Sequence, residues 1–206
     1  MIGIAFILPA AACDLDVPDH LKGIITSIPN IGIILTAPFW GRAADSRGRK
    51  PVLLGSLAGA GVLGLLASFM PTLLTFALCK LAGSLFLSVP SSLGYAYASE
   101  MLPRKRRDRA VMISNALVNL LTVLTPVLAW GILSFNWHYQ LGIISLRPWR
   151  LLTALYSLPL VLTAVWMTSA RESPKFLLTM GKDAEALEVV RHIYAVNNRQ
   201  AEDTFC

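Results

Sequence analysis

The chain has 206 residues, of which 55% are hydrophobic and only 15% are charged, and its formal net charge is +6. Soluble domains are about 25% charged, so this composition favours a protein that crosses a membrane several times. The positive charge does not indicate a nucleic-acid-binding protein, because Lys and Arg gather in short loops beside apolar segments. Three scattered cysteines form neither a disulfide framework nor a metal-ligand pattern.

Six apolar segments follow one another along the chain. The first, 1–13, is shorter than the ~20 residues that a helix needs to cross a bilayer. It lacks the positive start of a signal peptide, so we expect the end of a transmembrane helix whose beginning is missing. Complete spans are predicted at about 23–40, 51–70, 73–99, 110–133 and 151–170. Such long apolar runs indicate helices, and the predicted fold class is an all-α polytopic membrane protein.

The loops differ sharply in charge on the two sides of the predicted membrane. Loops 41–50, 100–109 and 171–206 hold fourteen Lys and Arg residues, whereas the opposite loops hold three. This bias predicts that the three basic loops are cytoplasmic. Trp137 and Trp149, near the outer ends of two spans, suit an interfacial aromatic belt.

The polar segment 171–206 is predicted to contain a cytoplasmic amphipathic helix. Asp183 is the expected N-cap, since it comes two residues after Gly181 and precedes a periodic apolar pattern. Leu187, Val190 and Tyr194 fall on one face, with Ile193 beside it. Packing of this face under the bundle is favoured, while contact with the membrane or with a partner stays open.

The segment 41–50 carries the most informative motif, and it is predicted to form a short charged turn between two spans. Its pattern, Gly-x-x-x-Asp-x-x-Gly-Arg-Lys, resembles the signature loop between the second and third helices of the major facilitator superfamily of transporters. Segment 95–109 resembles the loop after helix four in the sugar-porter and organic-ion branches. Segment 171–178 resembles the Pro-Glu-Ser-Pro-Arg motif after helix six, with Arg171 and Lys175 in place of the usual Pro and Arg.

Shorter strings narrow the resemblance to one branch. Segments 6–15, 147–150, 172–178, 185–187 and 193–197 are similar to the synaptic vesicle glycoprotein 2-like branch, especially its insect members. The resemblance implies a twelve-helix protein made of two six-helix halves. This chain is then the N-terminal half with a truncated first helix, a fragment or an incomplete gene model. The implied partners are the lipid bilayer, the missing C-terminal six-helix half and a small organic solute, with or without a coupling ion.

Charged residues at the cytoplasmic helix ends are candidates for a gate that closes the inner side. The resemblance implies this role for the signature Asp and Arg and for the Glu–Arg pairs, and solvated topology charges are the alternative. Gly41 is expected to permit close helix packing and Gly48 a tight turn. The complete candidate set is Gly41, Asp45, Gly48, Arg49, Glu100, Arg109, Glu172 and Lys175.

Polar residues inside the spans are candidates for a substrate cavity near the midplane. Lys80 is the one charge clearly inside a span, where it either faces a cavity and suits an organic anion, or snorkels outward. Asn115, Asn119 and Thr122 form a stripe on one helix, which suits a wet cavity or hydrogen bonds between helices. Asn30 forms a shorter stripe on the second helix.

The sequence contains no catalytic constellation, phosphate-binding loop or metal cluster, so we expect neither an enzyme nor a cofactor. The leading hypothesis is a secondary, alternating-access carrier in the plasma membrane or an intracellular vesicle membrane. A transporter-like receptor or vesicle-trafficking component without transport is the second hypothesis, and a non-functional truncation product is the third.

Overall fold

The computed structural model of the protein describes residues 3–12, 14–15, 17–135, 137, 139–141 and 144–198. Within these residues the chain forms α1 (Gly3–Ala11), α2 (Asp19–Arg47), α3 (Arg49–Ser68), α4 (Leu73–Met101), α5 (Arg104–Leu133), β1 (Tyr139–Leu141), β2 (Ile144–Leu146), α6 (Pro148–Thr168), α7 (Pro174–Thr179) and α8 (Asp183–Asn198). The predicted all-α class is confirmed, and the two short strands pair as an antiparallel hairpin between α5 and α6.

Five of the described helices, α2 to α6, are long and apolar enough to cross a membrane. The helices extend beyond the apolar segments of the sequence, because backbone hydrogen bonding continues where the side chains become polar. Thus α2 reaches Arg47 rather than residue 40, and α5 begins at Arg104 rather than at residue 110. α1 has nine residues, which is too few to span.

The predicted turn at 41–50 is wrong in its extent. α2 continues as a helix through Arg47 and α3 begins at Arg49, so the chain changes direction at Gly48 alone. Gly48 has φ 104° and ψ 158°, a backbone conformation that is essentially restricted to glycine. The charged residues of the motif are therefore held on helix ends rather than on a loop.

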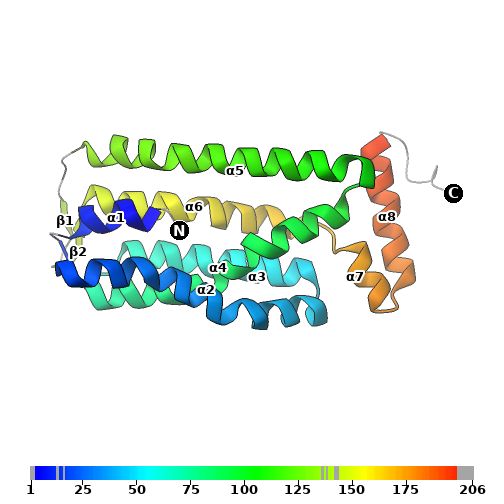
Figure 1. Cartoon of the computed structure of the whole chain (residues 1–206), viewed down its shortest axis with the longest axis horizontal. Coiled ribbons are helices and arrows are strands. Elements are labelled where there is room, and N and C mark those ends of the chain that lie inside the picture. Colours follow the sequence, from blue (N-terminus) through cyan, green and yellow to red (C-terminus); the bar gives the residue numbers. More distant parts are fainter. Residues whose placement is uncertain are drawn as a thin grey trace.

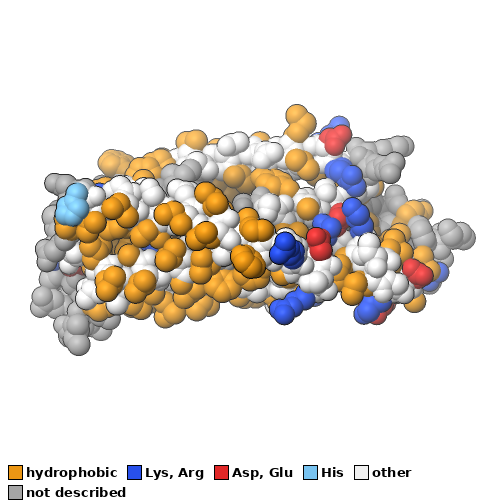
Figure 2. Space-filling view, turned by 60° about the horizontal axis from the view of Figure 1, so that its bottom comes forward, with side chains coloured by type: hydrophobic (Ala, Val, Ile, Leu, Met, Phe, Trp, Pro, Cys, Tyr) orange, Lys and Arg blue, Asp and Glu red, His pale blue; other side chains and the backbone are white. Residues whose placement is uncertain are grey.

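The five long helices run along the long axis of the molecule (Figure 1). α3 packs against both α4 and α6, and α2 packs against α4. α5 lies at the edge of the bundle and contacts α6 and α1. We name the two ends of the bundle by the elements there, the hairpin end and the α7–α8 end. Figure 2 shows hydrophobic side chains over the bundle and charged ones gathered at the α7–α8 end.

Glycines and short polar side chains allow the helices to approach closely, as is common in membranes. A Cβ on Gly61 of α3 would lie 2.7 Å from a methyl carbon of Val161 in α6. Between α2 and α4, the carbonyl of Leu85 accepts hydrogen bonds from Thr36 (2.9 Å) and from the indole of Trp40 (2.7 Å). The bundle thus combines tight packing with hydrogen bonds to backbone groups.

The largest apolar cluster of the described residues lies at the hairpin end and joins all the helices from α1 to α6. Its central aromatic pair is Phe76, 0% exposed, and Trp149, 1% exposed, with ring centroids 5.9 Å apart in an edge-to-face arrangement. The prediction that Trp149 belongs to an interfacial belt is therefore wrong, because this indole is inside the protein.

α8 lies across the α7–α8 end of the bundle (Figure 1) and packs on α7. The face that it buries contains Ala186, Val189 and Ile193, which meet Leu177 of α7. The predicted face was wrong by one position, since Leu187 is 44% exposed. Asp183 is the first helical residue rather than the N-cap.

Candidate functional site

A cluster of polar side chains at the α7–α8 end joins three helices. Arg49, at the start of α3, forms an ion pair with Glu100 near the end of α4 at 3.0 Å. Lys175 of α7 lies 3.8 Å from the same carboxylate, and the hydroxyl of Ser173 donates to it at 2.6 Å. The side chains of Arg49 and Glu100 are only 17% and 11% exposed. This partial burial makes the pair stronger than a solvated one.

Glu172 is the second acidic group of this cluster, and it binds backbone rather than a cation. Its carboxylate accepts from the N–H groups of Arg49 (3.1 Å) and Lys50 (3.0 Å), and from Ser173 (2.8 Å). Gly48 has no side chain that could cap α3, so Glu172 caps this helix from a distant part of the chain. Its charge also complements the positive end of the helix dipole.

Further contacts fasten the same region. The Lys50 ammonium donates to the carbonyl of Thr168 at the end of α6 (3.0 Å), and the Tyr97 hydroxyl donates to the carbonyl of Arg171. The guanidinium of Arg171 pairs with Glu188 of α8 at 2.8 Å. The ends of α3, α4 and α6 are thus connected to α7 and α8 by charged and polar contacts.

Three predicted gate residues do not join this cluster. Asp45 and Arg109 are exposed, and neither forms an ion pair or hydrogen bond within the described part of the chain. Gly41 is also exposed, and a Cβ there would meet nothing within 4 Å. The prediction that Gly41 permits close packing is therefore wrong for helix contacts inside this bundle.

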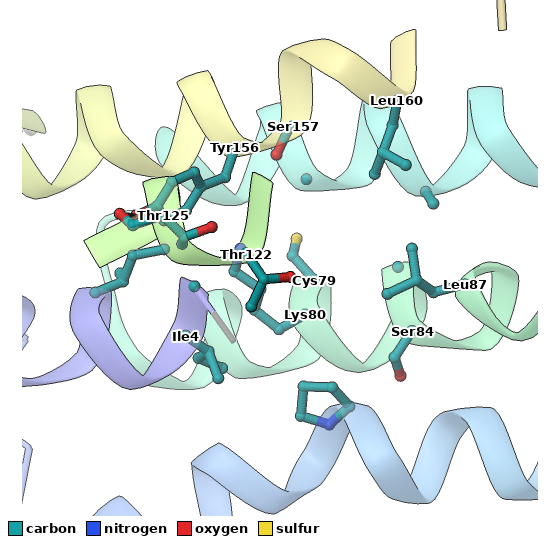
Figure 3. Close-up of a pocket in the computed structure, with 16 residues that line it drawn as sticks. Ile4, Cys79, Lys80, Ser84, Leu87, Thr122, Thr125, Tyr156, Ser157 and Leu160 are labelled. Carbon is teal, nitrogen blue, oxygen red and sulfur yellow. Dashed lines mark hydrogen bonds between the residues drawn. The ribbon is translucent and has the colours of Figure 1, made fainter. Parts of the chain in front are cut away.

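A cavity of about 380 Å³ lies inside the bundle, and all six helices α1 to α6 contribute to its wall. Figure 3 shows its labelled side chains surrounding one space between α1, α4, α5 and α6. Most of the lining is aliphatic or small, and its polar members are Cys79, Lys80, Ser84, Thr122, Thr125, Tyr156 and Ser157. A mainly apolar space with a few polar groups is typical of small-molecule sites.

The structure brings together only some of the predicted cavity residues. Lys80 and Thr122 line the cavity. Asn30, Asn115 and Asn119 are exposed on α2 and α5 and lie outside it. Asn115 accepts a hydrogen bond from the Tyr95 hydroxyl at 2.9 Å, which links α4 to α5 as the alternative interpretation expected.

Sequence reasoning missed several lining residues. Ser84 follows Lys80 by four positions on α4, so a polar stripe on that helix was the available signal. Tyr156 and Ser157 on α6 gave no comparable pattern, and Tyr156 reaches the wall by donating to the Thr125 carbonyl at 2.7 Å. Within the described residues no group of three His, Cys, Asp or Glu side chains could hold a metal ion.

A second polar cluster, which sequence reasoning also missed, lies at the hairpin end. Asp14, which follows α1, lies 3.2 Å from Arg147 and 3.6 Å from Arg150, and it accepts from the Trp149 indole at 3.1 Å. Arg150, only 4% exposed, also donates to the carbonyls of Ser68 (3.0 Å), the last residue of α3, and of Met70 (2.9 Å), just beyond that helix. One guanidinium thus joins α1, α3 and α6.

The long helices, the charged cluster and the inner cavity define one helical bundle of a polytopic membrane protein. Residues 1–193 match the family model of the Major Facilitator Superfamily, and the chain belongs to this superfamily. It is 30% identical to synaptic vesicle glycoprotein 2C of Rattus norvegicus and of Homo sapiens, and 29% identical to human synaptic vesicle glycoprotein 2A. Each alignment covers 95% of this chain and 27% of the relative, so the chain spans about a quarter of the length of these relatives.

Solved structures show the same fold. The proton:xylose symporter XylE bound to 6-bromo-6-deoxy-D-glucose superposes with a TM-score of 0.80 at 17% identity, over 93% of this chain and 45% of that chain. A partially occluded inward-open form of the xylose transporter XylE from E. coli gives a TM-score of 0.76 at 19% identity, over 94% and 51% of the two chains. The resemblance to the synaptic vesicle glycoprotein 2-like branch, inferred from short strings, is confirmed by the curated relatives.

Proposed function

We propose that this chain is the N-terminal half of a secondary carrier that moves a small organic solute across a membrane by alternating access. The observation that carries the proposal is the cavity, because side chains from all six helices of the bundle surround it. In such carriers the solute binds near the midplane and one half of the protein rocks against the other. We call the natural protein that contains this half and its partner half the full-length parent.

We further propose that the α7–α8 end is cytoplasmic and forms part of the inner gate. Its clusters of Lys and Arg favour this orientation. Arg49, Glu100, Glu172 and Lys175 hold the ends of α3, α4 and α7 together, so the bundle can move as one body. Asp45, exposed and without a partner among the described residues, is available to a group of the second half.

The proposal also explains the position of three polar side chains in the spans, those of Asn30, Asn115 and Asn119. They are exposed on α2 and α5, outside the inner cavity, and an amide facing lipid is costly. A second half that covered these helices would enclose the amides in a shared, wet cavity. The solute pathway then includes both the inner cavity and the face that carries these amides.

The test is uptake by the full-length parent in proteoliposomes, with a panel of radiolabelled sugars, organic cations and monocarboxylates. The wild-type parent should accumulate or exchange at least one of them. Glu100→Gln should lower the uptake rate severalfold, because it removes the charge that Arg49 and Lys175 share. The matched control is Glu185→Gln, which removes an exposed ion pair with Lys182 on α8 and should leave uptake unchanged.

A transporter-like protein without transport is the second candidate. The specific observation in its favour is that the relatives at about 30% identity are named synaptic vesicle glycoproteins, whereas the likeness to XylE at 17% identity shows the fold alone. A parent that reconstitutes in folded form and moves no member of the panel would support this candidate and contradict the carrier.

A further inference from the structure

Lys80 is the one charged residue among those that line the inner cavity. Within the described part of the chain its ammonium has neither an ion pair nor a hydrogen bond, and its recorded contact is the face of the Phe76 ring, 5.4 Å from the ring centroid. A cation inside a membrane span is energetically costly. Such a residue is therefore expected either to have a functional role or to reach water at the membrane surface. The position of Lys80 therefore needs an explanation.

Snorkelling to the outer surface does not explain this position. Lys80 stands eight residues into α4, and the path toward the hairpin end passes Phe76, one turn earlier on the same helix. Phe76 is 0% exposed and packs edge-to-face on Trp149, which is 1% exposed. This aromatic pair closes the direction in which a snorkelling lysine would extend, so the ammonium stays with the cavity.

The other polar groups of the cavity have already used their donors. The hydroxyls of Ser84, Thr122, Thr125 and Ser157 each donate to a carbonyl of their own helix, at 2.7 to 3.1 Å. Tyr156 donates to the Thr125 carbonyl. The strong donors that remain for a ligand are the three N–H groups of the ammonium.

The other residues that line the cavity indicate which chemical class of ligand would fit it. Ile4, Ile7, Leu87 and Leu160 surround the same space, and no described carboxylate lines it. A polyol such as a sugar needs many donors and acceptors, which this wall does not offer. A molecule with one anionic group and an apolar body satisfies both the ammonium and the aliphatic lining.

We propose that the inner cavity binds a small organic monoanion, such as a carboxylate with an apolar body, and that Lys80 pairs with its anionic group. This inference rests on the proposed function, because it takes the cavity as part of the solute site. It assigns the substrate class of that site.

The first experiment measures binding to the purified full-length parent in nanodiscs. The probes are hexanoate, benzoate and indole-3-acetate, each compared with its neutral amide. At least one carboxylate should bind, and its amide should bind about tenfold more weakly or not at all, because a charge-assisted contact is lost. Lys80→Met should weaken carboxylate binding to the level of the amide, and Lys80→Arg should restore part of it.

The matched control is Lys182→Gln, which removes one exposed positive charge just before α8, outside the cavity lining, and should not change binding. Lys80→Met is expected to fold, since it replaces a half-buried charge in an apolar helix with an apolar side chain of similar length. A melting temperature no lower than that of the wild type would verify this.

A second experiment needs no ligand, because the native Cys79 lines the cavity beside Lys80. With the other cysteines of the parent replaced by serine, anionic and cationic methanethiosulfonate reagents report the local potential. The anionic reagent should modify Cys79 faster than the cationic one, and Lys80→Met should abolish this preference. Cys79→Ser should abolish labelling.

The outcomes separate the two proposals. Uptake of a neutral solute that is insensitive to Lys80→Met, together with no binding of the carboxylates, would overturn the anion site and leave the carrier standing. Lys80-dependent binding of a carboxylate without any uptake would support the anion site and contradict the carrier. Equal reaction of both reagents would show that the ammonium does not control the potential in the cavity. No reaction of either reagent would show that the cavity is closed to solutes. Either result would overturn the inference.

Discussion

Gly48 separates α2 from α3, and both its backbone and its neighbours exclude a side chain. Its φ of 104° lies in a region that other residues rarely adopt. A Cβ there would also lie 2.6 Å from the Glu172 carboxylate and 3.1 Å from the Phe176 ring. The glycine therefore serves the turn and leaves space for the distant cap of α3.

Gly48→Ala should lower the stability of the protein by about 1–3 kcal/mol, because it adds backbone strain and displaces the Glu172 cap. The measurement is the unfolding temperature of the full-length parent in detergent. Gly41→Ala, in the same motif, is the control, since a Cβ at Gly41 meets nothing within 4 Å. Equal unfolding temperatures for the two variants would contradict the role assigned to Gly48.

Glu172 acts through its two carboxylate oxygens, which accept from three backbone N–H groups. Glu172→Ala should cost about 1–3 kcal/mol, because half-buried backbone donors lose their acceptor. Glu172→Gln retains one acceptor oxygen and should cost less than Glu172→Ala. Hydrogen–deuterium exchange at the start of α3 should accelerate in the alanine variant, and unchanged protection of Arg49 and Lys50 would refute the capping role.

The close contact between helices α3 and α6 depends on a glycine, which has no side chain. Gly61 is buried, and a Cβ there would meet Val161 at 2.7 Å from a side-chain carbon and 3.1 Å from the backbone nitrogen. Gly61→Val should therefore separate the two helices and cost about 1–3 kcal/mol through overpacking.

Gly55 of the same helix provides the control for that prediction. It is exposed and a Cβ there meets nothing within 4 Å, so Gly55→Ala should be neutral or stabilise α3 by up to about 1 kcal/mol. Thermal unfolding of the two variants measures the difference. Similar losses of stability in the two variants would indicate that α3 tolerates no substitution, and would contradict the importance of the single close contact at Gly61.

Arg150 connects three elements at the hairpin end, and its removal should affect all of them. Arg150→Met leaves Asp14 and the carbonyls of Ser68 and Met70 without this buried donor, with an expected cost of about 3–5 kcal/mol. Arg147, whose side chain is 35% exposed, is the matched control, and Arg147→Met should cost much less. The measurements are the unfolding temperature and the yield of monodisperse protein. Both should fall more in Arg150→Met than in Arg147→Met, and equal losses would contradict the role assigned to Arg150.

On the outside of the bundle, α2 and α5 leave large apolar side chains uncovered. Ile34 and Phe39 of α2 are 74% and 69% exposed, and Met112 and Trp130 of α5 are 71% and 76% exposed. In a membrane protein such surfaces meet lipid or another helix. In the proposed carrier they meet both the bilayer and the second half.

This chain and the rest of the parent, expressed as two polypeptides, should therefore co-purify as a complex. Asp45→Lys should reduce the recovery severalfold if Asp45 contacts the second half, since a reversed charge would repel its partner. Glu185→Lys, an exposed reversal on α8, should leave recovery unchanged. Equal recovery for all three forms would refute the contact at Asp45.

The all-α class and the family could both be predicted from the amino-acid sequence. Long apolar runs can satisfy their backbone in lipid only as helices, and the motif at 41–50 is recognisable without a structure. The sequence also selected Lys80 and Thr122 for the cavity, because polar groups within apolar helices are rare. These features are local or periodic along the chain, which is why they can be read from it.

Which of the candidate residues contact one another became known only from the three-dimensional structure. It paired Arg49 with Glu100, directed Glu172 to backbone N–H groups, and excluded Asn30 and Asn119 from the inner cavity. It also placed Asp14 beside Arg147 and Arg150, more than 130 positions away in the sequence. The physical reason is that contacts between helices depend on their rotation and crossing, to which a one-residue offset contributes about 100°. No pattern within a single helix specifies that rotation.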